Sequence, residues 1–194
     1  MFMFFIYLGA EIGFTGWISS YVVMLDLDTK EGATRFPALF WVFITIFRFA
    51  FAGVPGKTSS KLIILTLFKI CVYLLSIILT MIGFKLFAVY WNSILLGIAY
   101  SSMYTFMYTI SLEFKQSINR SQTASIMTFA NLGEGVLCTI MGYLMILFSP
   151  IALFYSLAFS GLIILALTHI LIKDLAKNEP ESKEIELRDK LNEE

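Results

Sequence analysis

The stretch from residue 2 to residue 25, FMFFIYLGAEIGFTGWISSYVVML, carries one charged side chain, Glu11, in an otherwise uncharged run. A helix needs about 20 predominantly apolar residues to cross the hydrocarbon core of a bilayer. Only helices and closed barrels satisfy all their backbone groups inside hydrocarbon, and this run lacks the alternation that is typical of barrel strands. The stretch therefore predicts a transmembrane helix with a carboxylate inside it.

The rest of the chain repeats this pattern. Of its 194 residues, 58% are hydrophobic and 14% are charged, whereas average soluble domains contain roughly 25% charged residues. Long uncharged stretches alternate with short charged ones. We therefore predict an all-α polytopic membrane protein, with a six-helix bundle over residues 1–172 and a charged cytoplasmic tail, in part transiently helical, over 173–194. The predicted spans are residues 2–25, 36–54, 61–82, 86–113, 122–148 and 150–172.

The distribution of Lys and Arg between the connecting segments predicts the orientation, because these residues concentrate in cytoplasmic loops. Six of them fall on one side and three on the other, which places both termini in the cytoplasm, in the plasma membrane or an internal membrane. The six are Lys57, Lys61, Lys115, Arg120, Lys173 and Lys177; the three are Lys30, Arg35 and Lys85. The lipid bilayer is thus a predicted partner, and a net charge of zero gives no reason to expect nucleic acid.

The glycines of the first segment indicate what surrounds Glu11. On a helical wheel Gly9, Gly13 and Gly16 share one narrow face, which is typical of a close-packed seam between membrane helices. Glu11 lies almost opposite. Ionisable groups inside a membrane usually face a bundle interior or a hydrated cavity. Two interpretations stay open: Glu11 lines a cavity, or it is a structural carboxylate bonded to a neighbouring helix.

Segment 122–148 carries a second acid, Glu134, at the border of a face of small and polar residues. Asn131 and Glu134 together could bind hydroxyl groups or a cation. The small residues alone would more often indicate tight packing. The shared face comprises Thr128, Asn131, Gly135, Cys138 and Gly142.

Segment 86–113 carries a stripe of hydroxyl-bearing and aromatic side chains, which suits an uncharged polyol such as a sugar. Sugars stack on aromatic rings and exchange hydrogen bonds with hydroxyls. Hydrogen bonding between helices is the alternative role for such residues. The stripe comprises Gly97, Ser101, Tyr104, Thr105 and Tyr108.

Four further ionisable side chains fall within or near the spans. Arg48 and Glu113 lie toward the same predicted side and could form a cytoplasmic gate pair, unless Arg48 snorkels outward. Lys69 is expected to snorkel, and His169 to lie at the interface. Segments 61–82 and 150–172 are otherwise poor in polar residues and are expected to face lipid. Two groups of three helices, each with an outer member, suggest a 3+3 inverted repeat.

No enzyme chemistry is indicated. A single histidine cannot complete a Ser-His-Asp or Cys-His set, and no metal-ligand spacing, P-loop or dinucleotide fingerprint occurs. We therefore expect no catalytic residue, no metal and no cofactor.

Several of these segments resemble the C-terminal half of a major facilitator superfamily transporter, most closely the fucose–proton symporter and sodium-dependent glucose transporter 1-like group. The resemblance covers about residues 1–172. It rests on YLGAEIGFTGWISSYVV (7–23), FWVFITIFRF (40–49), GIAYSSMYTFMYTISLE (97–113) and NLGEGVLCTIMGYLM (131–145). The chain departs from the group in having Phe47 in place of a glycine, Phe106 in place of a proline, and a GVPGKTSSK loop (53–61) without the acidic-arginine signature. In this group the acids tied to proton coupling lie in the other, N-terminal half.

The resemblance implies secondary active transport of a small polar solute, with a sugar as the guess by analogy, by alternating access. The implied coupling ion is H⁺ or Na⁺. The implied partner is an N-terminal six-helix half, supplied as missing sequence, a separate chain or a second copy. The alternative is a non-transporting membrane scaffold or a subunit of a larger complex; a six-helix channel ranks below both. The expected solute contacts are Glu11, Trp17, Tyr104, Tyr108, Asn131 and Glu134, and the expected gate is Arg48 with Glu113.

Overall fold

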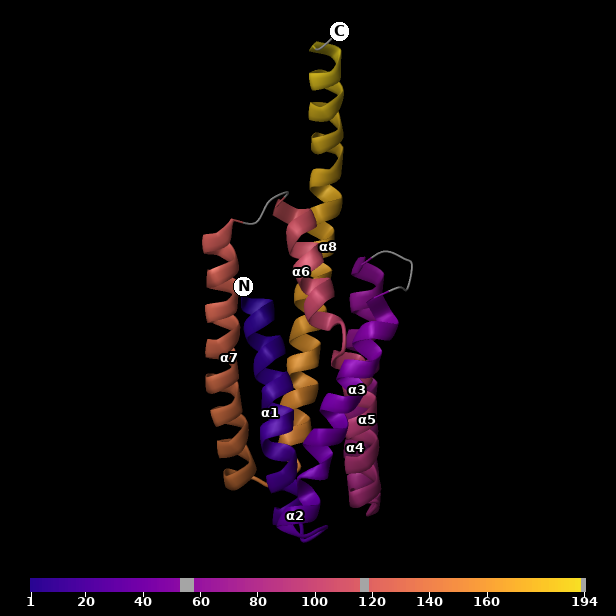
Figure 1. Ribbon diagram of the computed structural model, residues 1–194, viewed down its shortest axis with the longest axis vertical. Helices are drawn as coiled ribbons and strands as arrows, with labels where there is room; N and C mark the ends of the chain where they lie inside the picture. The colour runs from indigo at the N-terminus through magenta and orange to yellow at the C-terminus, as the bar shows by residue number, and fades with distance from the viewer. Residues whose placement is uncertain (53–57, 116–118, 193–194) are drawn as a thin grey trace.

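The computed structural model describes residues 1–52, 58–115 and 119–192, and within these ranges it contains helices and no strand. Within the described residues, six stretches are long and apolar enough to cross a membrane. Figure 1 shows the elements in chain order. They are α1 (Phe2–Met24), α2 (Lys30–Ala33), α3 (Arg35–Ala52), α4 (Thr58–Ile82), α5 (Lys85–Tyr100), α6 (Met103–Lys115), α7 (Arg120–Leu147) and α8 (Ala152–Asn192).

The prediction of six apolar spans in an all-α protein is confirmed, with two differences of detail. The fourth span, Lys85–Leu112, consists of two helices, because the helical hydrogen-bond pattern is interrupted by a turn at Ser101 and Ser102, although the Ser101 backbone itself keeps helical dihedral angles. The sixth helix does not end near residue 172 but continues as α8 to Asn192, and Figure 1 shows it extending beyond the bundle.

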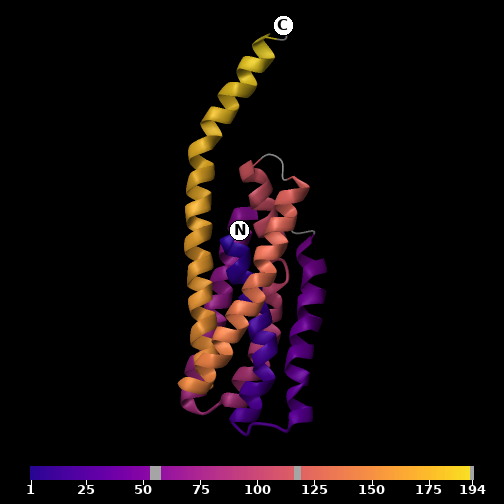
Figure 2. The ribbon, with the colours of Figure 1, turned by 90° about the vertical axis from the view of Figure 1, so that its left-hand side faces the viewer.

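The helices pack as an upright bundle around α1. α1 packs most extensively against α7, α3 packs against α5, and α4 packs against both α5 and α8. The two chain termini emerge at the same end of the bundle in Figure 1. Figure 2 shows α8 and α3 on opposite sides of the molecule.

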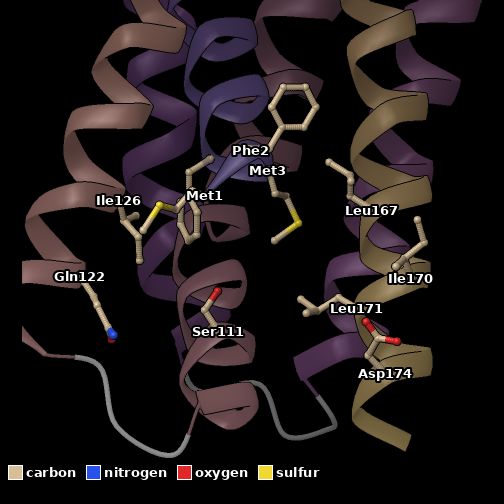
Figure 3. Close-up of a pocket in the computed structure, with 11 residues that line it drawn as sticks. Met1, Phe2, Met3, Ser111, Gln122, Ile126, Leu167, Ile170, Leu171 and Asp174 are labelled. Carbon is tan, nitrogen blue, oxygen red and sulfur yellow. The ribbon is translucent and has the colours of Figure 1, made fainter. Parts of the chain in front are cut away.

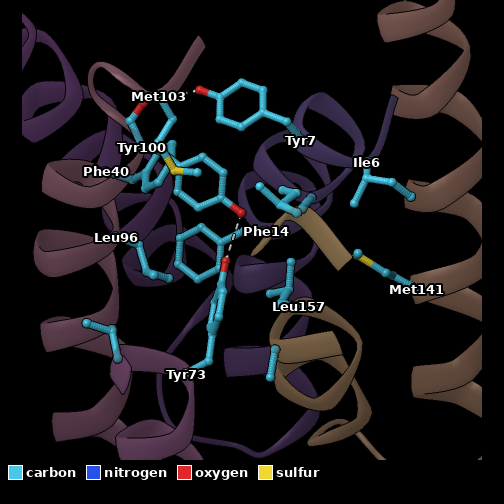
Figure 4. Close-up of a cluster of buried hydrophobic side chains, with 14 of the residues drawn as sticks. Ile6, Tyr7, Phe14, Phe40, Tyr73, Leu96, Tyr100, Met103, Met141 and Leu157 are labelled. Atoms are coloured by element: carbon cyan, nitrogen blue, oxygen red, sulfur yellow. Dashed lines mark hydrogen bonds between the residues drawn. The ribbon is translucent and has the colours of Figure 1, made fainter. Parts of the chain in front are cut away.

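Aromatic side chains from α1, α3, α4 and α5 fill the centre of the bundle. Tyr7, Phe14 and Phe40 are fully buried, as are Tyr73 and Tyr100. The Phe14 and Phe40 ring centroids lie 5.3 Å apart, and those of Tyr7 and Tyr100 lie 5.4 Å apart. Such offset aromatic pairs stabilise a core beyond the area they bury. Figure 4 shows these rings gathered where the helices meet.

The connection between α1 and α3 is held by polar contacts at the opposite end from the termini. Thr29 caps α2 by accepting a hydrogen bond from the Gly32 backbone N–H, 3.1 Å away, as N-cap threonines do. Arg35 forms an ion pair with Asp28, and its guanidinium carbon lies 5.0 Å from the centre of the Tyr90 ring. These contacts fix the angle at which α3 enters the bundle.

The outward faces of the helices are of two kinds. α4 and α8 expose large apolar side chains, including Ile64, Leu67, Leu74, Leu75, Ile78, Phe159 and Leu162. α3, α6 and α7 expose polar groups as well, among them Thr45, Arg48, Thr105, Thr128, Asn131 and Thr139. Segments 61–82 and 150–172 therefore turn apolar faces outward, and contact of these faces with lipid stays a prediction.

The prediction that segment 61–82 is poor in polar residues at its centre is wrong. One face of α4 buries a row of polar side chains at helical spacing: Thr66, Lys69, Ser76 and Thr80. Helical periodicity separates this inner row from the apolar outer face. α4 therefore packs a polar face inside the bundle and exposes an apolar face outside it.

Candidate functional site

The fourth span is interrupted between α5 and α6. α5 ends at Tyr100 and α6 begins at Met103. The Tyr100 carbonyl accepts a hydrogen bond from the Tyr7 hydroxyl at 3.1 Å, and the Ser101 carbonyl accepts one from Arg48 Nε at 2.8 Å. Backbone groups freed at membrane depth need such partners. Side chains of α1 and α3 therefore hold the interrupted span.

Glu11 lies one turn along α1 from Tyr7, and 4% of its surface is exposed. Its carboxyl group interacts with the Tyr7 side chain and lies in the electrostatic field of Arg48, Lys69 and Glu134. The prediction that Glu11 points away from the glycine seam is confirmed. Its surroundings are the polar interior of the bundle, so of the two interpretations left open, the packed carboxylate fits this conformation better than the cavity-lining one.

Lys69 was expected to snorkel toward the membrane surface, and this prediction is wrong. Its side chain is 0% exposed, and its Nζ lies 4.8 Å from the centre of the Tyr100 ring. The Lys69 stem packs beside Gly161 of α8, where a Cβ would lie 3.5 Å from Lys69 Cε. The closest atom to a Cβ at Gly161 would be Ile70 Cγ1, at 2.8 Å, so the absence of a side chain there lets α8 pack closely on α4 beside the buried lysine.

Hydrogen bonds extend this polar interior along α4. The hydroxyls of Tyr73 and Tyr100 lie 3.0 Å apart, and Figure 4 shows them pointing at each other. One turn further on, Ser76 donates to Asn92 Oδ1 of α5. Three contacts between α4 and its neighbours thus follow one helix face, the third joining Thr80 to Tyr21 at 3.4 Å.

The glycine seam of α1 packs closely against another helix, as predicted, and that helix is α7. A Cβ on Gly9 would lie 2.5 Å from the Gly133 carbonyl oxygen, and one on Gly13 would lie 2.5 Å from Met141 Sδ. Trp17 extends the seam, because its indole Nε1 donates to the Cys138 carbonyl at 2.7 Å. Trp17 was expected to contact solute; here it joins two helices.

This placement makes Trp17 a test of structural against solute-binding roles. We expect Trp17→Phe to lower the stability of the purified protein by about 1 kcal/mol, since one hydrogen bond is lost. In a chain of this size that corresponds to a fall in Tm of about 2–4 °C. Trp91→Phe, which alters an exposed ring on α5, should leave the Tm unchanged. Equal Tm values for wild type and Trp17→Phe would contradict the structural role.

The remaining predicted solute contacts lie on or near the outward faces of α6 and α7, which expose polar groups. Tyr104 is half-buried, and its hydroxyl donates to Met127 Sδ of α7 at 3.4 Å. Asn131, one helical turn beyond Met127, is exposed; Glu134 and Tyr108 are half-buried. Tyr104 and Asn131 therefore belong to adjoining parts of one surface, whereas Glu11 is buried and Trp17, which is half-buried, is bonded to α7.

The structure describes the side chain of only one member of the predicted gate pair, Arg48. Arg48 is exposed along much of its side chain, and its Nε is bonded to the break in the fourth span. The side chain of Glu113 lies outside the described residues. The Arg48–Glu113 contact therefore stays a prediction.

A cavity of about 430 Å³ opens at the end of the bundle where the termini emerge (Figure 3). Its lining is mainly apolar and comes from α1, α6, α7 and α8, with Ser111, Gln122 and Asp174 as its polar groups. None of the predicted solute contacts lines it. The cavity and the buried polar cluster are therefore different places in the fold.

Sequence reasoning missed several members of the central cluster: Tyr7, Lys69, Tyr73, Tyr100 and Asn92. A signal for α4 was present, because Lys69, Tyr73, Ser76 and Thr80 recur at intervals of three to four residues, the period of one helix face. The sequence also did not identify Gly133 as a close-packing residue. In the structure a Cβ at Gly133 would overlap the Phe5 carbonyl.

The described residues contain no group of three or more His, Cys, Asp or Glu side chains placed to hold a metal ion. No protein-family model, curated protein or solved structure matches the chain.

Proposed function

We propose that this chain is one half of a carrier that moves a small polar solute across a membrane by alternating access. The observation that carries the proposal is the interrupted fourth span, held by Tyr7 and Arg48 beside the buried Glu11 and Lys69. Discontinuous helices with polar groups at the break are typical of the binding regions of secondary transporters. Ionisable residues inside a membrane are expensive and usually functional.

The division of the outer surface supports the same proposal. Apolar faces on α4 and α8 suit lipid, whereas an exposed Asn131 and a half-buried Glu134 would be costly there. A second six-helix half, packed on α3, α6 and α7, would remove this cost and enclose a hydrated path. We therefore place the solute between the two halves, in contact with Tyr104, Tyr108, Asn131 and Glu134, both termini being cytoplasmic. A sugar remains the solute suggested by the resemblance.

We test this proposal by uptake into proteoliposomes that contain the chain, alone or with a co-expressed second half, and a panel of radiolabelled sugars and polyols. We expect Glu134→Gln to reduce uptake about tenfold or more, because a single charge-assisted hydrogen bond to solute contributes roughly 1.5–3 kcal/mol. Tyr143→Phe, on the exposed face of α7, is the matched control and should transport normally.

The alternative is a membrane scaffold that transports nothing. It is favoured by the packed state of Glu11 and by the Trp17–Cys138 bond, both of which stabilise the bundle. A scaffold predicts no uptake of any tested solute above that of empty liposomes, in every combination with a second half. That result would overturn the carrier proposal.

A further inference from the structure

Lys69 is a buried cation whose amino group makes no hydrogen bond in the structure. Among the described residues, Lys69 Nζ and Asn92 Nδ2 are the buried side-chain nitrogens without a hydrogen-bond partner. The side chain is 0% exposed, and packing against Gly161 and the Tyr100 ring sets its direction. A charge held in this way is expensive, so its position calls for a compensating negative charge.

The buried carboxylate of the same cluster is Glu11. It lies one turn along α1 from Tyr7, whose hydroxyl donates to the Tyr100 carbonyl at 3.1 Å, and Lys69 Nζ lies 4.8 Å from the centre of the Tyr100 ring. Glu11 and Lys69 therefore belong to one buried cluster and act on each other electrostatically, although no ion pair within 4.0 Å joins them among the described residues. Phenol groups from α1, α4 and α5 stand around them: Tyr7, Tyr73 and Tyr100. Arg48 of α3 and Glu134 of α7 complete the charged groups that act on Glu11.

This cluster contains the groups that would bind a free cation, a backbone carbonyl and a buried carboxylate. The side chains of Arg48 and Lys69 already supply the positive charge there. In broken membrane helices, the unwound carbonyls and helix ends commonly coordinate a coupling cation. Here the Ser101 carbonyl at the break accepts from the cationic Arg48. The buried carboxylate that would complete such a site has the Lys69 ammonium as its neighbour. The cationic side chains of Arg48 and Lys69 therefore occupy the two positions, at the Ser101 carbonyl and at the Glu11 carboxylate, where a free cation would bind.

We propose that Lys69 is a built-in counter-cation for Glu11, occupying the place that a free coupling cation such as Na⁺ would otherwise take. This inference rests on the proposed function and names the ion requirement of this half: the cluster needs no Na⁺. Removing the lysine charge would leave the Glu11 carboxylate without the buried cation of its cluster and would create a site for a free one.

The experiment measures the Tm of the purified full chain in lipid nanodiscs, in sodium, potassium or choline chloride at about 0.15 M. Wild type should give the same Tm in all three salts. Lys69→Met keeps the side-chain length and removes the charge. It should lower the Tm in choline chloride by roughly 10 °C, because a buried carboxylate that loses its counter-charge destabilises the folded state strongly. Sodium or potassium should recover part of that loss.

Two further variants make the test specific. Glu11→Gln combined with Lys69→Met removes both charges, so its Tm should rise above that of Lys69→Met and should be the same in all three salts. Lys173→Met, which alters an exposed lysine near the end of the last span, should behave as wild type. If Lys69→Met yields no folded protein, recovery of folded protein in the double variant supports the proposal and continued misfolding overturns it.

The proposal would be overturned if the Tm of Lys69→Met were the same in all three salts. A wild-type Tm that rises specifically with Na⁺ would also overturn it. The measurement needs no solute and no second half. A failure of the uptake experiment therefore leaves this test intact, and a failure here leaves the carrier proposal standing with a different ion.

Discussion

Gly133→Ala should destabilise the bundle more than any other single-methyl addition to α7, by about 3 kcal/mol or more. A Cβ at Gly133 would overlap the carbonyl group and Cα of Phe5. These are backbone atoms, so no side-chain rotation can relieve the overlap, and α1 and α7 must separate. The separation would also loosen the Gly9 contact, which faces the Gly133 carbonyl from the other helix. We expect a Tm at least about 6 °C below wild type.

Two other glycines provide graded controls for this experiment. Gly13 faces the Met141 thioether, a flexible side chain that can move aside, so Gly13→Ala should cost clearly less than Gly133→Ala. At Gly135 an added Cβ would have no neighbouring atom within 4 Å, and alanine favours helix more than glycine does. Gly135→Ala should therefore be neutral or slightly stabilising. Equal Tm values for all three variants would contradict the predicted α1–α7 contact.

The sequence predicted the six spans and the glycine seam because both depend on local pattern. A run of about 20 apolar residues identifies a span without any knowledge of its neighbours. Gly9, Gly13 and Gly16 share a face by helical spacing alone. Which helix packs against that face depends on tertiary structure. The sequence therefore did not identify α7 as the partner or Gly133 as part of the contact.

Lys69 shows where pattern reasoning failed. A lone lysine inside an apolar span ordinarily snorkels, and that general rule decided the prediction. The structure buries it where α8 packs on α4 around Gly161, a residue more than ninety positions later in the chain. The partners of Lys69 also come from two other helices, α1 and α5. Such placement depends on how four helices meet, which periodicity within one segment does not encode.

The break at Ser101 and Ser102 lies inside the GIAYSSMYTFMYTISLE stretch, which contains no proline. Phe106 stands where the resembled group has a proline, a common cause of helix kinks. The interruption instead falls one turn earlier, where Tyr7 and Arg48 offer hydrogen bonds to the freed carbonyls. Serines that compete for backbone groups weaken a helix, and Ser101 Oγ indeed donates to the Ile98 carbonyl at 2.7 Å.

Removing both donors should therefore open the fourth span locally. Tyr7→Phe deletes the hydroxyl that donates to the Tyr100 carbonyl, and Arg48→Met deletes the guanidinium that donates to the Ser101 carbonyl. Each change leaves a carbonyl of the bundle interior without that partner, at a cost of about 1–3 kcal/mol. Because the two carbonyls are adjacent in one break, we expect the double variant to deviate from additivity by roughly 0.5 kcal/mol or more, the range seen for coupled sites.

Hydrogen–deuterium exchange of peptides covering residues 98–106 measures this opening directly. Exchange there should accelerate in each single variant and most in the double variant, since local opening free energies set exchange rates. Arg48→Lys retains a cationic donor, so its exchange should lie between wild type and Arg48→Met. Tyr143→Phe removes a hydroxyl from the exposed face of α7 and should change neither exchange nor Tm. Unaltered exchange in the double variant would mean that side chains of α1 and α3 do not hold the break, and it would remove the observation on which the carrier proposal depends.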